Sequence, residues 1–173
     1  QNSILWSDQG RAFVVGPESH STKNRIYSGI AMRNVDVLRV NNYEPDWAKG
    51  VLAINCGDGA TVRNVAFQNI RVGPVPPGTS LLSLTMTPTP FNASPGGLIQ
   101  NITFNNVSLE GATQYPNTIY GYDAGHLVKG VRFTNLRING ACVGSATAGD
   151  ILTNGFTKNI TFSCPPASGT STR

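Results

Sequence analysis

Carboxylates are the side chains of this sequence that best suit acid–base chemistry. Hydrolysis of a glycosidic bond uses two of them, about 5 to 9.5 Å apart, one as acid and the other as base or nucleophile. Asp8 and Glu18 flank a predicted short strand at residues 13–15, and both could face one groove. Asp58 stands in a Gly-Asp-Gly turn further along the chain. Asp8 and Glu18 are therefore candidate catalytic residues and Asp58 a candidate substrate contact, although each also suits a turn or capping role.

Two tryptophans could complete such a site. Trp6 and Trp47 lie in or near predicted loops or strand ends, where an indole face can stack on a sugar ring, and simple packing is the alternative. His20 and His126 are isolated from each other, and the sequence holds no HxH, HExxH, CxxC or G-x-S-x-G pattern. We therefore expect no metal site and no cofactor.

Three cysteines bear on the compartment. Cys142 and Cys164 lie 22 residues apart among small and turn-forming residues, and they are the predicted disulfide. Cys56 is then left over, either as a buried free thiol or with a partner outside this chain. Such a disulfide needs an oxidising compartment, so we expect a secreted, extracellular protein.

Four N-x-S/T sequons, at Asn92, Asn101, Asn106 and Asn159, also suit the secretory pathway. Asn92 lies in a stretch rich in Pro and Thr, and it is expected to be exposed and glycosylated. Asn101 and Asn159 are further candidate glycosylation sites. Asn106 is expected to point inward, which would leave its sequon unused.

Composition indicates the elements that must position these residues. Charged residues make up only 13% of the chain, whereas Gly (19) and Pro (11) are abundant, as in proteins with many short strands joined by tight turns. No stretch approaches the roughly 20 apolar residues of a membrane span, so no membrane is expected as a partner. The net charge is +4, but Lys and Arg are scattered in the sequence, so no nucleic acid is expected either.

One pattern recurs along the whole chain: I/V-x-N/G-I/V-x-F/M-x-N-V/I/L-x-V/I/L. Its fourth positions are spaced 35, 37, 29 and 29 residues apart, which corresponds to one supersecondary unit per repeat. Within each copy apolar and polar residues alternate, and this alternation shifts by one residue across the Asn that precedes the last three positions of the pattern. Two short strands that meet at a bend are expected to show such a shift. The fourth positions are Ile30, Val65, Ile102, Val131 and Ile160.

Stacking these copies predicts an all-β, right-handed parallel β-helix of about five coils over residues 1–164, truncated at its N-terminal end and followed by a disordered tail at 165–173. Met32 and the phenylalanines 67, 104, 133 and 162 should form an internal stack. The asparagines 34, 69, 106 and 135 should form a ladder at the bend, where Asn tolerates left-handed backbone geometry. Loops at 41–49, 73–78, 83–97 and 112–125 could shape a groove. A β-sandwich whose strands are similar by coincidence is the alternative.

The segment WSDQGRAFVVGPE (residues 6–18), the coil at 30–37 and the segment GVLAINCGDG (50–59) carry a resemblance. Together they resemble the polygalacturonase-like β-helix proteins of glycoside hydrolase family 28, and more distantly the dextranase family. Residues 10–16 stand where that family has G-H-G-x-S-I-G, with Arg11 in place of the histidine. Residues 52–54 (LAI) fall near its R-I-K segment without the Arg or Lys. The resemblance places Asp8 and Glu18 beside the expected groove, and it makes Arg11 a candidate partner for an acidic substrate or for one of those carboxylates.

The family's catalytic aspartates lie on coils before this motif, so the resemblance implies that they would be upstream of residue 1. The expected function is therefore the C-terminal part of a secreted polysaccharide-degrading glycoside hydrolase, with a polysaccharide as substrate. Further N-terminal coils, or another chain, are the expected partner at an open N-terminal edge. The alternative is a non-catalytic β-helix module that binds carbohydrate or builds a filament.

Overall fold

The protein consists of two stacked β-sheets, which we name sheet A and sheet B. The structure, a computed structural model, describes residues 1–17, 25–41, 49–86, 88–90 and 92–166. Sheet A contains β1 (Ser3–Ser7), β3 (Ile26–Val40), β5 (Thr61–Val72), β7 (Leu98–Leu109), β9 (Leu127–Ile138), β10 (Ala141–Cys142) and β12 (Thr157–Ser163). Sheet B contains β2 (Phe13–Val15), β4 (Gly50–Asn55), β6 (Ser80–Thr85), β8 (Asn117–Tyr120) and β11 (Ile151–Thr153).

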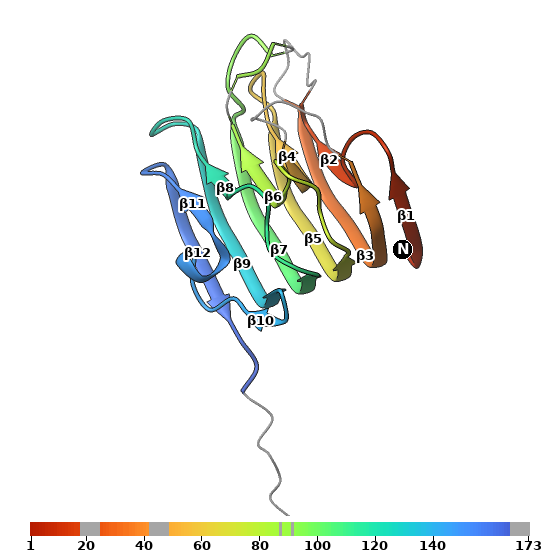
Figure 1. Cartoon of the computed structure of the whole chain (residues 1–173). Helices are drawn as coiled ribbons and strands as arrows, with labels where there is room; N and C mark the ends of the chain where they lie inside the picture. Colours follow the sequence, from red (N-terminus) through yellow and green to blue (C-terminus); the bar gives the residue numbers. More distant parts are fainter. Residues whose placement is uncertain (18–24, 42–48, 87, 91, 167–173) are drawn as a thin grey trace, which may run out of the picture.

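The chain passes back and forth between the sheets, and up to β9 each strand of sheet A is followed by one of sheet B. Neighbours within each sheet are parallel, except for the short hairpin of β9 and β10. Figure 1 shows the strands side by side in chain order, with β1 at one end of the stack and β12 at the other. The fold is thus all-β with parallel strands in stacked sheets, and neither sheet closes on itself.

A short 3-10 turn at Thr147–Gly149 is the one helical element among the residues that the structure describes. Within the same residues, no helix is long and apolar enough to cross a lipid bilayer.

The strand register confirms the stack that the sequence pattern predicts. Phe67 pairs in register with Met32 on one side and with Phe104 on the other, and the series continues to β9 and β12. Ring centroids of successive phenylalanines lie 4.8 to 4.9 Å apart with planes within 18° of parallel. Phe13 of sheet B meets Phe67 edge-on at 4.9 Å, which ties the two sheets together.

Left-handed residues bend the strands of sheet A. Asn69 and Asn106 have φ near +55°, as do the corresponding residues of β3 and β9. The Nδ2 of Asn106 donates to Oδ1 of Asn69 at 3.1 Å, and Oδ1 of Asn106 accepts from Nδ2 of Asn135 at 2.9 Å. The predicted ladder is therefore confirmed from Asn69 to Asn135, because Asn is the non-glycine residue that best tolerates this conformation and its amide can bond the strand on either side. Asn34 shares the left-handed backbone, but its Oδ1 accepts from Arg71 and its Nδ2 donates to Asn2.

The expectation that Asn106 points inward is wrong, because its side chain is exposed. The inward positions on either side of the bend are taken by Phe104 and Val107, both of which are buried. A left-handed residue between them turns its own side chain toward solvent. Five residues before each of these bends lies a second left-handed position, occupied by Gly29, Asn64, Asn101 and Gly130, which we did not predict.

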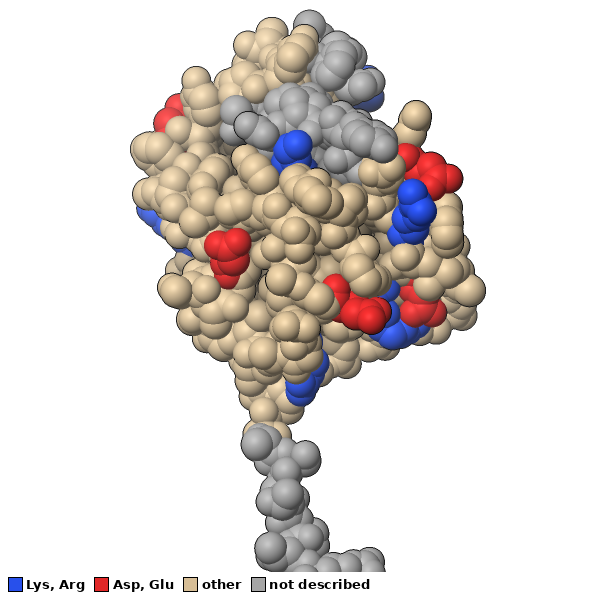
Figure 2. All heavy atoms as spheres, in the orientation of Figure 1, with Lys and Arg blue, Asp and Glu red and all other residues tan. Residues whose placement is uncertain are grey.

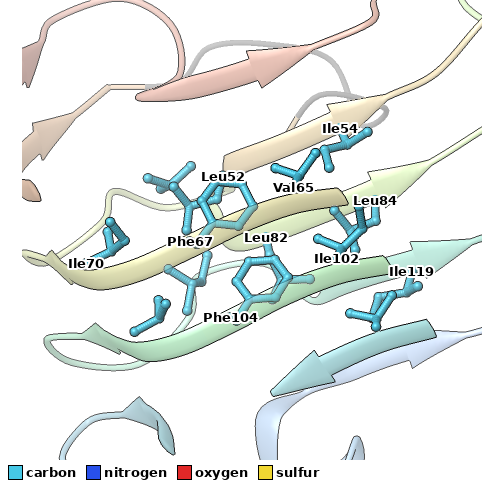
Figure 3. Close-up of a cluster of buried hydrophobic side chains, with 14 of the residues drawn as sticks. Leu52, Ile54, Val65, Phe67, Ile70, Leu82, Leu84, Ile102, Phe104 and Ile119 are labelled. Carbon is cyan, nitrogen blue, oxygen red and sulfur yellow. The ribbon is translucent and has the colours of Figure 1, made fainter. Parts of the chain in front are cut away.

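The core lies between the sheets. Side chains from β4, β6 and β8 meet side chains from β5 and β7, as Figure 3 shows. The labelled members are Leu52, Ile54, Leu82, Leu84 and Ile119 from sheet B and Val65, Phe67, Ile70, Ile102 and Phe104 from sheet A. The side of β4 and β6 turned away from this core is buried as well, so every residue of these two strands is buried. The strands of sheet A alternate between buried and solvent-facing residues instead.

A disulfide closes the last part of the fold. Cys142 and Cys164 are bonded, as predicted, with their Cα atoms 6.0 Å apart. β10 and β12 both pair with β9, β12 along its first half and β10 at its end. The bond thus joins two short segments that cover one edge of the same strand. Cys56 is a free, buried thiol.

Candidate functional site

Trp6 and Asp8 lie together at the margin of sheet A. The pairing of β1 with β3 shifts register between Leu5 and Trp6, so that Trp6 lies opposite Arg39. Such an irregularity re-aims a side chain, and here the indole is 63% exposed. A large aromatic side chain with so much exposed surface is unusual on a strand, and it marks Trp6 as a candidate binding residue.

Arg39 and Asp8 complete this cluster. The Trp6 Nε1 donates to Oδ1 of Asp8 at 3.2 Å, and Nε of Arg39 lies 3.2 Å from the same oxygen. The Arg39 guanidinium carbon is 5.6 Å from the indole centroid, within range of a cation–π interaction. The three side chains therefore hold one another in place while each remains accessible to a ligand.

An open pocket of about 450 Å³ adjoins the cluster, and we name it the Trp6 pocket. Its volume falls within the range of small-molecule sites, and its apolar wall with a few polar groups suits a sugar ring. It is lined by Trp6, Leu38, Arg39, Val40, Asn41, Pro74, Val75 and Pro76.

Arg11 belongs to a different cluster. Its Nη1 donates to Oδ1 of Asn55 at 2.8 Å, and Nδ2 of Asn55 donates to Oγ1 of Thr85 at 2.7 Å. Asn55 is 2% exposed and alternates with the core residue Ile54, so the chain of hydrogen bonds runs on the side of sheet B away from the core. Arg11 is thus set in place by β4 and β6, whereas Trp6 and Asp8 are positioned by β3.

Asp58 has a structural role in the Gly-Asp-Gly turn. Its backbone is left-handed with φ 49°, its Oδ1 accepts from the amide of Ser94 at 3.2 Å, and its own amide donates to the Ser94 carbonyl at 2.9 Å. These bonds tie the Gly-Asp-Gly turn to the loop before β7, which is the structural role that the turn sequence allowed. Glu18 and Trp47, the other two predicted site residues, lie outside the described residues.

A second pocket, of about 440 Å³, lies further along the same margin of sheet A. Asp36 and Arg71, neighbours in register on β3 and β5, form a hydrogen-bonded ion pair in its wall. The Arg71 guanidinium holds the pKa of Asp36 below its usual value. Glu110 and Arg137 also line the pocket. Sequence reasoning missed these residues, although Asp36 and Arg71 each follow the ladder Asn by two positions.

The sequons differ in accessibility. Asn92 was expected to be exposed, but it is only 4% exposed, and its Nδ2 donates to the Pro17 carbonyl at 2.7 Å and to Oγ1 of Thr89 at 3.1 Å. It packs against Gly57, where a Cβ atom would collide with it. The prediction of exposure is therefore wrong. Asn101 and Asn159, the other two candidate glycosylation sites, are exposed.

His126 pairs with Asp123 rather than with other metal-binding side chains. Its Nδ1 lies 2.6 Å from Oδ1 of Asp123, and the imidazole is the main cause that lowers the pKa of this carboxyl. In the part of the chain that the structure describes, no three His, Cys, Asp or Glu side chains group as metal ligands would.

Comparisons with family models, with curated proteins and with solved structures found no match for this chain. Its function must therefore be inferred from the geometry of the sites themselves.

Proposed function

We propose that the chain forms coils of a right-handed parallel β-helix. The support is the regular passage of the chain between two parallel sheets, together with side-chain stacks that stay in register from β3 to β12. Crossover connections between parallel strands are right-handed in nearly all proteins, which gives the handedness. Each coil contacts mainly the coils before and after it, as in other repeat proteins.

On these coils we propose a carbohydrate-binding site at the Trp6 pocket, in a secreted polysaccharide-degrading hydrolase similar to the polygalacturonase group. The observation that carries the proposal is the exposed indole of Trp6, held beside Asp8 and Arg39 at an open pocket. Sugar rings stack on aromatic faces, and their hydroxyls bond to fixed carboxylate and guanidinium groups. The disulfide is consistent with an oxidising compartment.

Further coils would pack on β1 and β2, which have a strand neighbour on one side only among the described residues. Ile4 and Val14 on these strands are 69% and 41% exposed. In the hydrolase that we propose, the catalytic aspartates stand on those coils, and Asp8 and Glu18 contribute from this side of the groove.

Binding is tested by calorimetric titration of the protein with oligosaccharides from glucans, galactans and galacturonans. The Trp6→Ala variant should bind the preferred sugar about tenfold more weakly, because it loses the stacking surface. Phe156→Ala is the matched control, since Phe156 is also a partly exposed aromatic residue but lies away from the pocket. If Trp6→Ala and wild type bind with equal affinity, the Trp6 pocket is not the carbohydrate-binding site.

Catalysis is tested by release of reducing ends from the same polysaccharides by the protein with its preceding coils. Asp8→Asn and Glu18→Gln should each lower turnover while thermal unfolding stays unchanged. Full activity in both variants would exclude these carboxylates from the chemistry.

A non-catalytic binding module is the second candidate. Asp8 and Asp36 are ion-paired and the Asp58 carboxylate accepts from the amide of Ser94, so each of these carboxylates already has a structural partner. A module of this kind would keep the Trp6-dependent affinity and show no hydrolysis of any of the polysaccharides.

A further inference from the structure

The two sheets differ sharply in charge. The strands of sheet B contain no charged residue, whereas those of sheet A contain eight Lys or Arg residues and a single acid, Asp36. That acid is bonded to Arg71. Scattered in the sequence, the cations are gathered on one sheet by the fold. We name five of them the basic face: Arg33, Arg63, Lys129, Arg132 and Lys158.

These cations lie on the solvent side of sheet A. Arg63, Lys129 and Lys158 fall in one row across the strands, with Gln100 of β7 between the first two. Neighbouring residues on the same strands, such as Val65 and Val131, are fully or almost fully buried in the core. Four members of the basic face are exposed and Lys129 is half-buried.

Within the described ranges, the positive charge of the basic face is not balanced by nearby acids. Among the described residues, none of its five members has a carboxylate within ion-pair distance. Lys129 and Lys158 are direct register neighbours on adjacent strands, an arrangement of like charges that destabilises a sheet. A bound anion would relieve this repulsion, so the unfavourable pairing of like charges favours an anionic ligand at this place.

Polar but uncharged side chains separate the cations. Thr103, on β7, is the register neighbour of Arg132, and Asn105 and Thr134 pair with each other on β7 and β9 at further solvent-facing positions. They offer hydroxyl and amide groups to a ligand that carries many hydroxyls. On the face of the molecule displayed in Figure 2, charged side chains are scattered, and some basic ones at the right of the view lie beside acidic ones.

We propose that the basic face binds an anionic polysaccharide, whose carboxylate or sulfate groups lie along the row of cations. The strands are about 4.8 Å apart, a spacing comparable with the repeat of one sugar ring, so successive charged sugars can meet successive strands. Single-stranded nucleic acid is less well matched, because its binding uses aromatic platforms between the cations and these rows have none. The proposal does not rest on the Trp6 pocket or on hydrolysis.

The test is a titration of the full chain with fluorescently labelled polygalacturonate and, separately, with dextran sulfate. Neutral dextran and single-stranded DNA serve as comparisons. Wild type should bind one or both polyanions, with affinity that falls as salt is added. The triple variant R63Q/K129Q/K158Q should bind roughly tenfold more weakly, because it loses three of the contacts. A preference for polygalacturonate identifies a carboxylated ligand, and one for dextran sulfate a sulfated ligand.

The matched control is R63K/K129R/K158R, which changes the same positions but keeps their charge and should bind as wild type does. Phe156→Ala, at a partly exposed aromatic residue outside both the basic face and the Trp6 pocket, should also leave binding of dextran sulfate unchanged. Thermal unfolding without ligand should occur at the same or a higher temperature in R63Q/K129Q/K158Q, since like-charge repulsion is relieved. Unchanged affinity in that variant, no affinity in wild type, or tighter binding of DNA than of either polysaccharide would each overturn the proposal.

Discussion

Asn106 shows how one side chain can serve both its own backbone and its neighbours. It adopts a left-handed conformation that most residues avoid, and it also donates a hydrogen bond to one coil and accepts one from the next. An exposed residue would ordinarily contribute little to stability. Here the ladder makes an exposed position structural.

We predict that Asn106→Ala lowers the free energy of unfolding by about 1–3 kcal/mol, because alanine is strained in the left-handed conformation and cannot make the two hydrogen bonds of the side-chain amide. Denaturant unfolding measures the change. Asn105→Ala is the matched control, since Asn105 is also exposed, is not among the left-handed residues and lies one position away. The ladder has no energetic role if the two variants unfold alike.

Cys56 should be chemically inert in the folded protein. Its Sγ donates to the Ala60 carbonyl at 2.8 Å, and burial raises the pKa of the thiol to about 12. The thiolate is the reactive form, so alkylation at pH 8 should be about a thousandfold slower in native protein than in urea. Mass spectrometry of the alkylated protein gives the rate, and rapid labelling under native conditions would contradict the predicted burial.

The same pKa shift predicts a dependence of stability on pH. The unfolded chain loses the Cys56 proton near the ordinary thiol pKa, whereas the folded chain keeps it until about pH 12. The contribution of this thiol to stability is therefore complete below the unfolded pKa and is lost as pH rises above it. The Cys56→Ala variant should lose less stability than wild type between pH 8 and pH 10.

At the scale of elements, the strands of sheet A were the most predictable part of the molecule. Their inward positions repeat from coil to coil, and apolar periodicity is a strong signal, so the Phe stack and the Asn ladder followed from the sequence alone. The shift between Leu5 and Trp6 did not, because a bulge depends on how β1 fits β3 and has no local pattern. Asn92 was misjudged for a similar reason: its partners Pro17 and Gly57 are distant in sequence.

The disulfide should stabilise the end of the stack, because it joins the two segments that cover β9. Closing a 22-residue separation is worth about 3 kcal/mol in the unfolded-chain model. We therefore predict that Cys142→Ser/Cys164→Ser lowers the free energy of unfolding by that amount. Dithiothreitol should bring wild type to the same value and leave the variant unchanged. A wild type that is insensitive to the reductant would contradict this role.

At the scale of the molecule, the charge distribution could not be predicted from the sequence. Arg63, Lys129 and Lys158 are separated by 66 and 29 residues, so no local run of basic residues exists. They become neighbours in one row only when the register of four strands is known. The repeat fixes which positions are neighbours across the strands. The residue types at its solvent-facing positions vary from copy to copy, however, so they form no recurring pattern as the apolar positions do.

The two ends of the stack should behave differently in solution. Sheet A ends on one side at β1, a single strand with exposed apolar residues, and on the other at the disulfide-linked pair of β10 and β12. Open strand edges of this kind promote association. We predict that the chain self-associates with rising concentration, and that Ile4→Lys/Val14→Lys reduces the association by placing charges at the open end.

Sedimentation velocity over a range of concentrations measures this effect. The control is Leu152→Lys, which adds a charge at the opposite end of sheet B. If two chains associate through their N-terminal ends, this variant should leave the dimer intact. A chain that stays monomeric at every concentration would contradict the prediction.

The constant register between β5, β7 and β9 makes the coil an interchangeable unit. Each coil presents the same inward residues to the coil before and after it, so its two contact surfaces match each other. Duplication of the gene segment for residues 98–126 would therefore insert a coil that fits between existing ones without new contacts having to be invented. Proteins built this way can change length, and with it the length of polymer that they span, through copying errors rather than through gradual redesign of a core.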